Sequence, residues 1–117
     1  MNMYNWIEQM IYTERKKPMP ILTFPAVQYL FVTTRELVAD PNHQAIGMRL
    51  IADHYDMPIA FGYMDLSVEA EAFGANTVYS ADEVPVIIEK LIANHEDADA
   101  LAIPEIGAGR TASRLKA

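Results

Sequence analysis

Three acidic side chains lie close together at Asp65, Glu69 and Glu71, in the sequence Asp-Leu-Ser-Val-Glu-Ala-Glu. They follow an almost wholly apolar run over residues 59–64, and the residues after Asp65 have the composition of a helix. Ligands of α/β proteins bind at the carboxyl ends of strands, so Asp65 is placed where such chemistry occurs. We therefore take Asp65 as a candidate catalytic and substrate-binding residue.

The directions of the two glutamates follow from helical spacing. On a helix beginning at Leu66, Glu69 borders the apolar face and Glu71 points away from it. Glu69 is thus the second candidate for binding a substrate. An alternative account needs no chemistry, because Asp65 would cap the helix and both glutamates would complement its dipole.

The histidines are not spaced to share a metal ion. His43 and His54 fall on one predicted helix, but three turns separate them by about 16 Å along its axis. His95 belongs to a polar loop, and the sequence has no cysteine. We expect no metal site and no disulfide in this sequence, and the lack of cysteine is compatible with the reducing cytoplasm.

A glycine-containing stretch over residues 107–112 fits the G-x-G-x-x-A pattern of dinucleotide-binding loops. However, Pro104 interrupts the strand that should precede such a loop, and no ribose-binding acid follows in the sequence. We interpret the match as a coincidence. Arg110 within it is a candidate for binding a substrate anion, although a surface arginine at the start of a helix is the simpler account.

The composition limits the partners of the protein. The sequence of 117 residues is 51% hydrophobic and 21% charged, which is typical of one globular domain. Its 16 acidic and 9 basic side chains give a net charge of −7, which argues against nucleic acid or an anionic membrane as a partner. We find no apolar stretch near 18 residues and no secretory leader, and we expect a cytoplasmic protein.

Local patterns predict alternating helices and short strands. The clearest start signals are a capping box at Thr33 and Glu36 and the N-cap and N1 pair Asp40-Pro41, and Gly74 is a clear stop signal. We predict helices over residues 3–14, 33–38, 41–55 and 66–73, with strands at 21–24 and 59–64, the latter buried on both faces. We further predict a strand at 77–79, a turn at 80–85, an ambiguous stretch at 86–92, and helices starting near 96 and 109.

The string Tyr-Met-Asp-Leu-Ser-Val-Glu-Ala-Glu-Ala-Phe-Gly-Ala over residues 63–75 resembles the amino-terminal third of the uroporphyrinogen decarboxylase superfamily. It is more similar to the corrinoid branch of that superfamily, the methylcobamide:coenzyme M methyltransferases. Other matching pieces follow the family's order: Pro20-Ile21-Leu22, Asp40-Pro41, His54-Tyr55-Asp56, Glu83-Val84-Pro85 and Gly109-Arg110.

The resemblance implies an α/β fold. Members of the superfamily are TIM (β/α)8 barrels about three times as long as this sequence, and eight strands with their helices need roughly 250 residues. Residues 1–117 would then be a single incomplete domain, the N-terminal part of a TIM barrel-like fold, too short to close a barrel alone.

The resemblance also implies a chemistry. Asp65 matches the aspartate that faces the tetrapyrrole nitrogens in the decarboxylases, but residues 24–29 replace the family's two-arginine motif, which argues against porphyrinogen decarboxylation. The Glu-Ala-Glu pattern favours the methyltransferases, in which a zinc-bound thiolate takes a methyl group from a corrinoid. The zinc ligands would lie beyond residue 117, so we expect this chain alone to bind no cofactor and to be inactive.

A second hypothesis is a non-catalytic α/β interaction module that associates with itself. Unpaired strand edges of an incomplete barrel recruit partners, which favours a homo-oligomer. A corrinoid or tetrapyrrole ligand is expected only in a complete protein, and a tetrapyrrole decarboxylase-like protein is a further alternative.

Overall fold

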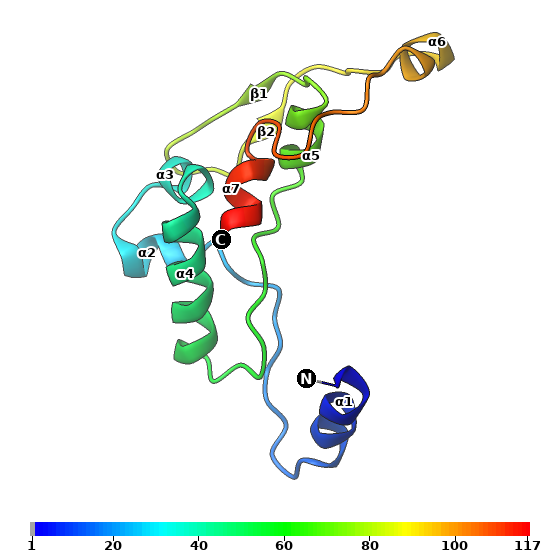
Figure 1. Ribbon diagram of the computed structural model, residues 1–117. Coiled ribbons are helices and arrows are strands. Elements are labelled where there is room, and N and C mark those ends of the chain that lie inside the picture. The colour runs from blue at the N-terminus through cyan, green and yellow to red at the C-terminus, as the bar shows by residue number, and fades with distance from the viewer. Residues whose placement is uncertain (1) are drawn as a thin grey trace.

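The computed structural model describes residues 2–117 as a helical body with one small sheet, so the chain mixes α and β structure (Figure 1). The elements in chain order are α1 Met3–Tyr12, α2 Ala26–Leu30, α3 Thr34–Ala39, α4 Pro41–His54, α5 Ser67–Ala72, β1 Thr77–Val78, β2 Val86–Ile87, α6 His95–Asp99 and α7 Thr111–Lys116.

The core lies where α2, α3 and α4 meet the extended segment after α4. Leu37 of α3 and Ile51 of α4 are its largest wholly buried side chains, and Ala26 and Tyr63 complete the buried cluster. Tyr63 packs edge to face on Phe24, with ring centroids 5.4 Å apart. Burying these apolar surfaces is the main favourable term that holds the three helices together.

The predicted helix starts around α3 and α4 are confirmed. The hydroxyl of Thr33 accepts from the Glu36 backbone N–H at 3.1 Å, while the Glu36 carboxylate accepts from the Thr33 N–H at 2.8 Å. Asp40 accepts from the Asn42 N–H at 2.8 Å, and Pro41 occupies the first helical position. These contacts satisfy amides that have no partner inside a helix.

The two segments predicted as early strands are extended but unpaired. Residues 21–24 and 59–64 form no strand within the described chain, so the strand predictions there are wrong. Residues 59–64 are not buried on both faces either, because Met64 is 52% exposed beside the buried Tyr63. One layer of helices covers one side of the segment, and no second layer is present among residues 2–117 to cover the other.

The paired strands form a small antiparallel ribbon. β1 and β2 pair with Thr77 opposite Ile87 and Val78 opposite Val86. The strand predicted at residues 77–79 is confirmed, although β1 is one residue shorter than predicted. β2 lies within the stretch at 86–92 whose sequence pattern is ambiguous. The ribbon lies near α5, while α6 projects beyond it (Figure 1).

The molecule is elongated. Its radius of gyration is 17.3 Å, whereas a compact domain of this length has about 13 Å. α1 stands apart from the body on an extended arm and buries none of its residues (Figure 1). None of the helices formed by residues 2–117 combines the length and apolarity that a membrane crossing requires.

Candidate functional site

Asp65 ends the extended segment that follows α4, and its side chain is wholly inaccessible to solvent. One carboxylate oxygen accepts from the Ser67 backbone N–H at 3.1 Å and from the Ser67 hydroxyl at 2.6 Å. The N-cap of α5 is Leu66, which makes no side-chain cap hydrogen bond, so the account in which Asp65 is the N-cap is wrong. Asp65 lies one residue before the N-cap and still binds the first residue of α5, and its side chain is buried, which capping does not require.

Arg110 reaches the same place from the start of α7. One nitrogen of its guanidinium donates to the second carboxylate oxygen of Asp65, and Nη2 donates to the Ser67 hydroxyl at 2.7 Å. The Arg110 side chain is only 10% exposed. The simpler sequence account, a surface arginine at the start of a helix, is therefore wrong.

Glu71 and Tyr79 complete the arrangement on its outer side. Nε of Arg110 donates to the Glu71 carboxylate at 2.7 Å and to the Tyr79 hydroxyl at 2.8 Å. The Tyr79 hydroxyl donates to the same Glu71 oxygen at 2.6 Å, and the guanidinium carbon lies 5.0 Å from the Tyr79 ring centroid. We call the set of Asp65, Ser67, Glu71, Tyr79 and Arg110 the arginine network.

The electrostatics of the arginine network favour a charged guanidinium. Burial by itself lowers the pKa of Arg110, but hydrogen bonds to Asp65 and Glu71 outweigh burial, so its pKa lies above the usual value. Burial and the hydrogen bond to Glu71 raise the pKa of Tyr79. The guanidinium of Arg110 is therefore shared between two carboxylates, those of Asp65 and Glu71.

Glu69 lies apart from the arginine network. It is exposed and lines a cavity of about 330 Å³ between α5, α7 and residues 104–107, whose lining also includes Val68 and Arg114. The expectation that Glu71 points away from the rest of the chain is wrong, because its carboxylate accepts from Arg110. That expectation took the face of Leu66 and Phe73 as the packed one, whereas both side chains are exposed and the buried residues of α5 are Ser67 and Val68.

The glycine-containing loop at residues 107–109 positions Arg110 beside Glu71. Gly107 and Gly109 adopt positive φ values of 87° and 56°, which are costly for residues with a Cβ. A Cβ on Gly109 would come within 3.4 Å of a Glu71 carboxylate oxygen. These two turns lead the chain into Arg110 beside Glu71, which is a local reason for glycine that requires no dinucleotide.

Several other buried polar atoms have no hydrogen-bond partner among residues 2–117. They include Oε1 of Gln44, the hydroxyl of Tyr63 and Nη1 of Arg114. Burial raises the pKa of Tyr63 to about 12, and burial lowers the pKa of Arg114 despite the nearby carboxylates of Asp65 and Glu69. The Arg114 guanidinium lies 6.0 Å from the Tyr63 ring centroid, so α7 also contacts the core.

The three histidines lie in different surroundings, and His95 is the first residue of α6 rather than part of a loop. Nδ1 of His43 lies 3.7 Å from the Asp40 carboxylate, and His54 packs between the rings of Tyr29 and Tyr55. Among residues 2–117, no three His, Cys, Asp or Glu side chains are grouped so that they could hold a metal ion.

The sequence analysis found Asp65 and Arg110 but did not pair them, and it missed Ser67 and Tyr79. A serine two residues after a buried aspartate is a recognisable hydrogen-bonding pattern that could have identified Ser67. Nothing in the sequence places Arg110 beside α5, because it is 39 residues beyond Glu71. Tyr79 is only eight residues beyond Glu71, but no helical or strand spacing relates the two.

Comparisons with known proteins add no relative. No protein-family model, no curated protein and no solved structure matches this chain.

Proposed function

We propose that residues 1–117 are the amino-terminal part of a uroporphyrinogen decarboxylase-like TIM barrel. We further propose that the complete protein is cytoplasmic and transfers a methyl group from a methylated corrinoid to the sulfur of a thiol. The motif over residues 63–75 supports this proposal by its resemblance to the corrinoid methyltransferases. The position of Asp65 at the end of an extended segment supports it on structural grounds.

The observation that carries the proposal is the shared direction of two extended segments. Lys17 pairs with Asp56 at 2.6 Å, and seven residues further along both segments Phe24 packs on Tyr63. In each pair, the two residues are 39 positions apart in the sequence. Figure 1 draws the two segments side by side. Neighbouring strands of a TIM barrel run parallel in this way.

The burial pattern agrees with a strand that is short of neighbours. Tyr63 and Asp65 are buried, whereas the intervening Met64 is 52% exposed. No backbone hydrogen bond joins residues 13–24 to 56–65 in the described chain, and most of the non-proline amides of residues 14–24 and 59–65 donate to no backbone carbonyl there. In a longer protein, further strands would turn the two segments into part of a parallel sheet.

In this proposal, Asp65 stabilises positive charge on the corrinoid or substrate by its negative charge, because its side chain is inaccessible and both its oxygens already accept hydrogen bonds from Ser67 and Arg110. Arg110 is a positioning residue that fixes the Asp65 carboxylate, and Glu69 lines the adjoining cavity where a substrate would bind. The described residues do not fit a zinc site, because they lack both a suitable group of ligands and cysteine. We therefore derive no step through zinc from this chain.

Methyl transfer from methylcobalamin to 2-mercaptoethanol tests the proposal. The assay uses the longest natural form of the protein that contains these residues, and follows the corrinoid absorbance. Asp65→Asn should lower the rate at least 10-fold, whereas Glu89→Gln, which removes an exposed carboxylate, should leave it unchanged. Residues 1–117 alone should transfer no methyl group.

Two results would overturn this assignment. One is an Asp65→Asn protein, shown to be folded by circular dichroism, that transfers methyl groups at the full rate. The other is a natural protein that transfers none to a panel of small thiols. A role for Arg110 in positioning Asp65 is tested separately by Arg110→Lys, which should lower kcat more than it changes KM for the thiol.

A second candidate function is a non-catalytic module that associates with itself. The chain exposes 8,350 Å² of surface, whereas a compact protein of 13.1 kDa exposes about 6,400 Å². This excess favours an interaction role for part of the surface, whether or not the complete protein is an enzyme.

A further inference from the structure

The apolar side of α1 is only partly covered by the other described residues, because Trp6 and Met10 are half-buried and the rest of the side is exposed. Met3, Ile7 and Ile11 are 49%, 44% and 61% exposed, and they lie on one stripe of the helix with Trp6 and Met10. α1 and the arm that follows it border an apolar groove of about 610 Å³. An isolated helix of this length is marginal in water, so the stripe needs a surface to pack against.

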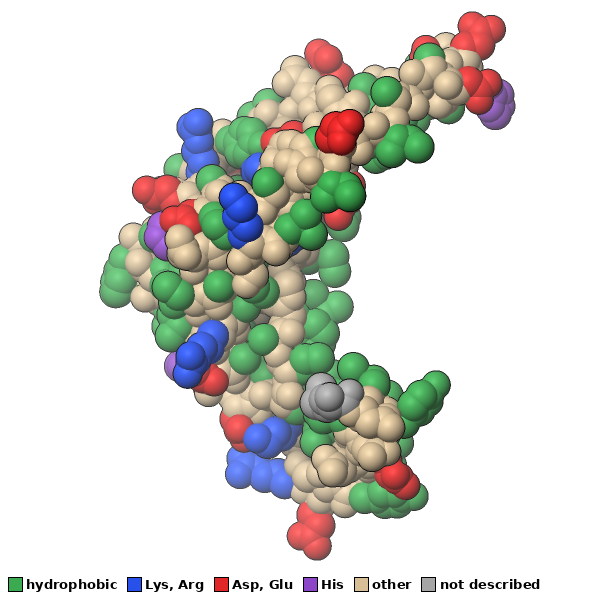
Figure 2. All heavy atoms as spheres, in the orientation of Figure 1, with side chains coloured by type: hydrophobic (Ala, Val, Ile, Leu, Met, Phe, Trp, Pro, Cys, Tyr) green, Lys and Arg blue, Asp and Glu red, His purple; other side chains and the backbone are tan. Residues whose placement is uncertain are grey.

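A complementary apolar groove lies at the other end of the molecule. It has a volume of about 440 Å³, and we call it the end groove; its lining is Met64, Leu66, Ser67, Val84, Pro85, Val86 and Ile87. Leu66 is 79% exposed and Val86 is 54% exposed. Figure 2 shows hydrophobic side chains along the hollowed side between α1 and the upper part of the molecule.

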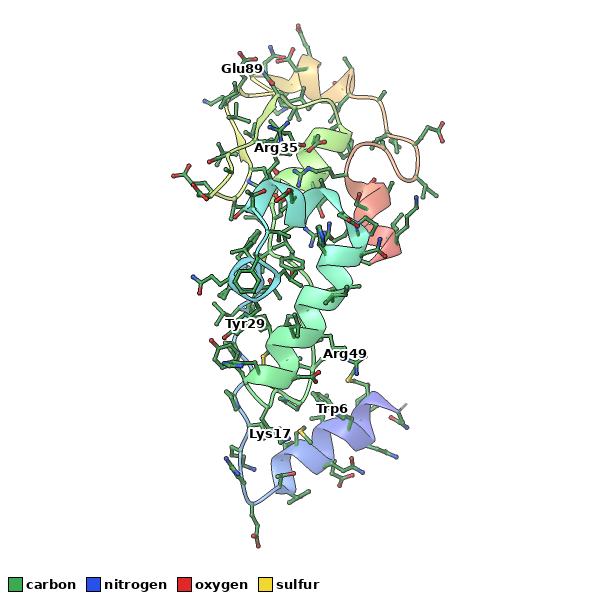
Figure 3. The ribbon with its side chains drawn as sticks, turned by 90° about the vertical axis from the view of Figure 1, so that its left-hand side faces the viewer. Trp6, Lys17, Tyr29, Arg35, Arg49 and Glu89 are labelled. Atoms are coloured by element: carbon green, nitrogen blue, oxygen red, sulfur yellow. The ribbon has the colours of Figure 1, made fainter. Side chains whose placement is uncertain are left out.

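The two ends differ in charge. Residues 2–20 carry three basic side chains, Arg15, Lys16 and Lys17, against two acidic ones, whereas residues 80–105 carry seven acidic side chains against one lysine. Figure 3 places Lys17 and Glu89 at opposite ends of the molecule. Opposite potentials across an interface favour one orientation of the partners and disfavour others.

We propose that α1 docks in the end groove of a second copy of this chain, and that the second copy does the same in return. Two copies side by side in opposite directions bring each basic end to the partner's acidic end. The same pair of surfaces then meets twice about a two-fold axis, so the assembly closes as a dimer. The proposal rests on the second candidate function, the self-associating module, and not on the proposed methyl transfer.

The available area is sufficient for such a dimer. A stable interface buries about 800 Å² on each partner. The chain exposes roughly 2,000 Å² more than a compact protein of its mass, on the scaling of surface with mass. Two reciprocal contacts place both α1 and the end groove of each chain in the interface.

Sedimentation equilibrium of the chain tests the proposal. We expect a dimer at micromolar concentration, and we expect Ile7→Glu and Leu66→Glu each to weaken dimerisation by about 100-fold or more, because each places a charge in both contacts. Tyr12→Glu is the matched control. It adds the same charge to α1 at a side chain that is 78% exposed and lies off the apolar stripe, so the dimer should persist.

Circular dichroism establishes that each variant keeps its helical content, which the exposure of the substituted side chains makes the expected result. A wild-type chain that stays monomeric at 100 µM overturns the proposal. So does a Leu66→Glu chain that dimerises normally, since α1 would then pack on the partner's α1 or elsewhere. Neither result bears on methyl transfer, which has its own assay.

Discussion

Arg110 and Asp65, 45 residues apart in sequence, form an ion pair inside the protein. The pair joins the start of α7 to the end of the extended segment after α4, and Ser67 bonds to both members. The arginine network thereby fixes the direction of the candidate carboxylate. A buried ion pair is a weak source of stability, but the loss of one member is costly because the other stays buried and uncompensated.

Arg110→Met should lower the free energy of unfolding by about 3 to 5 kcal/mol, because it leaves Asp65 buried without its cation. Urea denaturation followed by circular dichroism measures the change. The double variant Asp65→Asn with Arg110→Met should be more stable than Arg110→Met alone. An Arg110→Met protein as stable as the wild type would contradict the burial of Asp65.

Gly47 on α4 lies against Tyr63. A Cβ at Gly47 would overlap the Tyr63 hydroxyl and come within 2.9 Å of the Ala26 Cβ, so Gly47→Ala should cost about 1 to 3 kcal/mol. Gly62→Ala is the control, because a Cβ there meets nothing within 4 Å. Adding Tyr63→Phe to Gly47→Ala should recover part of the loss, since it removes the overlapped and unpaired hydroxyl. Equal effects of the two glycine substitutions on unfolding would contradict this packing.

Stability should fall in alkaline solution through Tyr63. The unfolded chain loses the Tyr63 proton near the ordinary pKa of 10, whereas burial raises the pKa in the folded protein to about 12. The contribution of the neutral phenol is therefore complete below pH 10 and is lost as the pH rises towards 12. Thermal unfolding between pH 9 and 12 should show a smaller alkaline decline in Tyr63→Phe than in the wild type. An identical decline in both proteins would exclude this role.

The capping box of α3 should contribute measurably to stability. Thr33→Ala removes the hydroxyl that accepts from the Glu36 amide, and should cost about 1 kcal/mol. Thr13→Ala serves as a control, because the Thr13 hydroxyl donates to a carbonyl at the end of α1 and caps no free amide. A Thr13 variant with a lower free energy of unfolding in urea than the Thr33 variant would contradict the assignment.

The sequence predicted helix boundaries correctly where the boundary depends on contacts between residues close in sequence. The caps at Thr33 and Asp40 involve residues within three positions of each other, and Gly74 ends its segment with a φ of 96° that suits glycine. The starts of α3 and α4 and the end of α5 were therefore predictable, whereas the sequence analysis missed α2. The same local pattern placed Asp65 at the junction of an extended segment and α5.

The remaining features depend on contacts between distant segments. Burial of Arg110 requires α7 to pack beside α5, and no local pattern carries that information. The inward bond of Glu71 has the same cause. The apolar segments 21–24 and 59–64 have strand composition, but strand pairing also needs a partner at the right distance, which the described chain does not supply.

The shared direction of the two extended segments is the central structural claim, and the absence of cysteine makes it directly measurable with pairs of spin labels. Pulsed electron paramagnetic resonance would measure distances in the exposed pairs Ile21→Cys with Ala60→Cys, Ile21→Cys with Asp56→Cys, and Ile21→Cys with Met64→Cys. The 39-residue offset of the contacts makes Ala60 the nearest position to Ile21, and a shift of four residues along a strand adds about 13 Å of axial separation. We expect the distance to Ala60 to be the shortest of the three. A shorter distance to Asp56 or Met64 would contradict the parallel register and, with it, the barrel proposal.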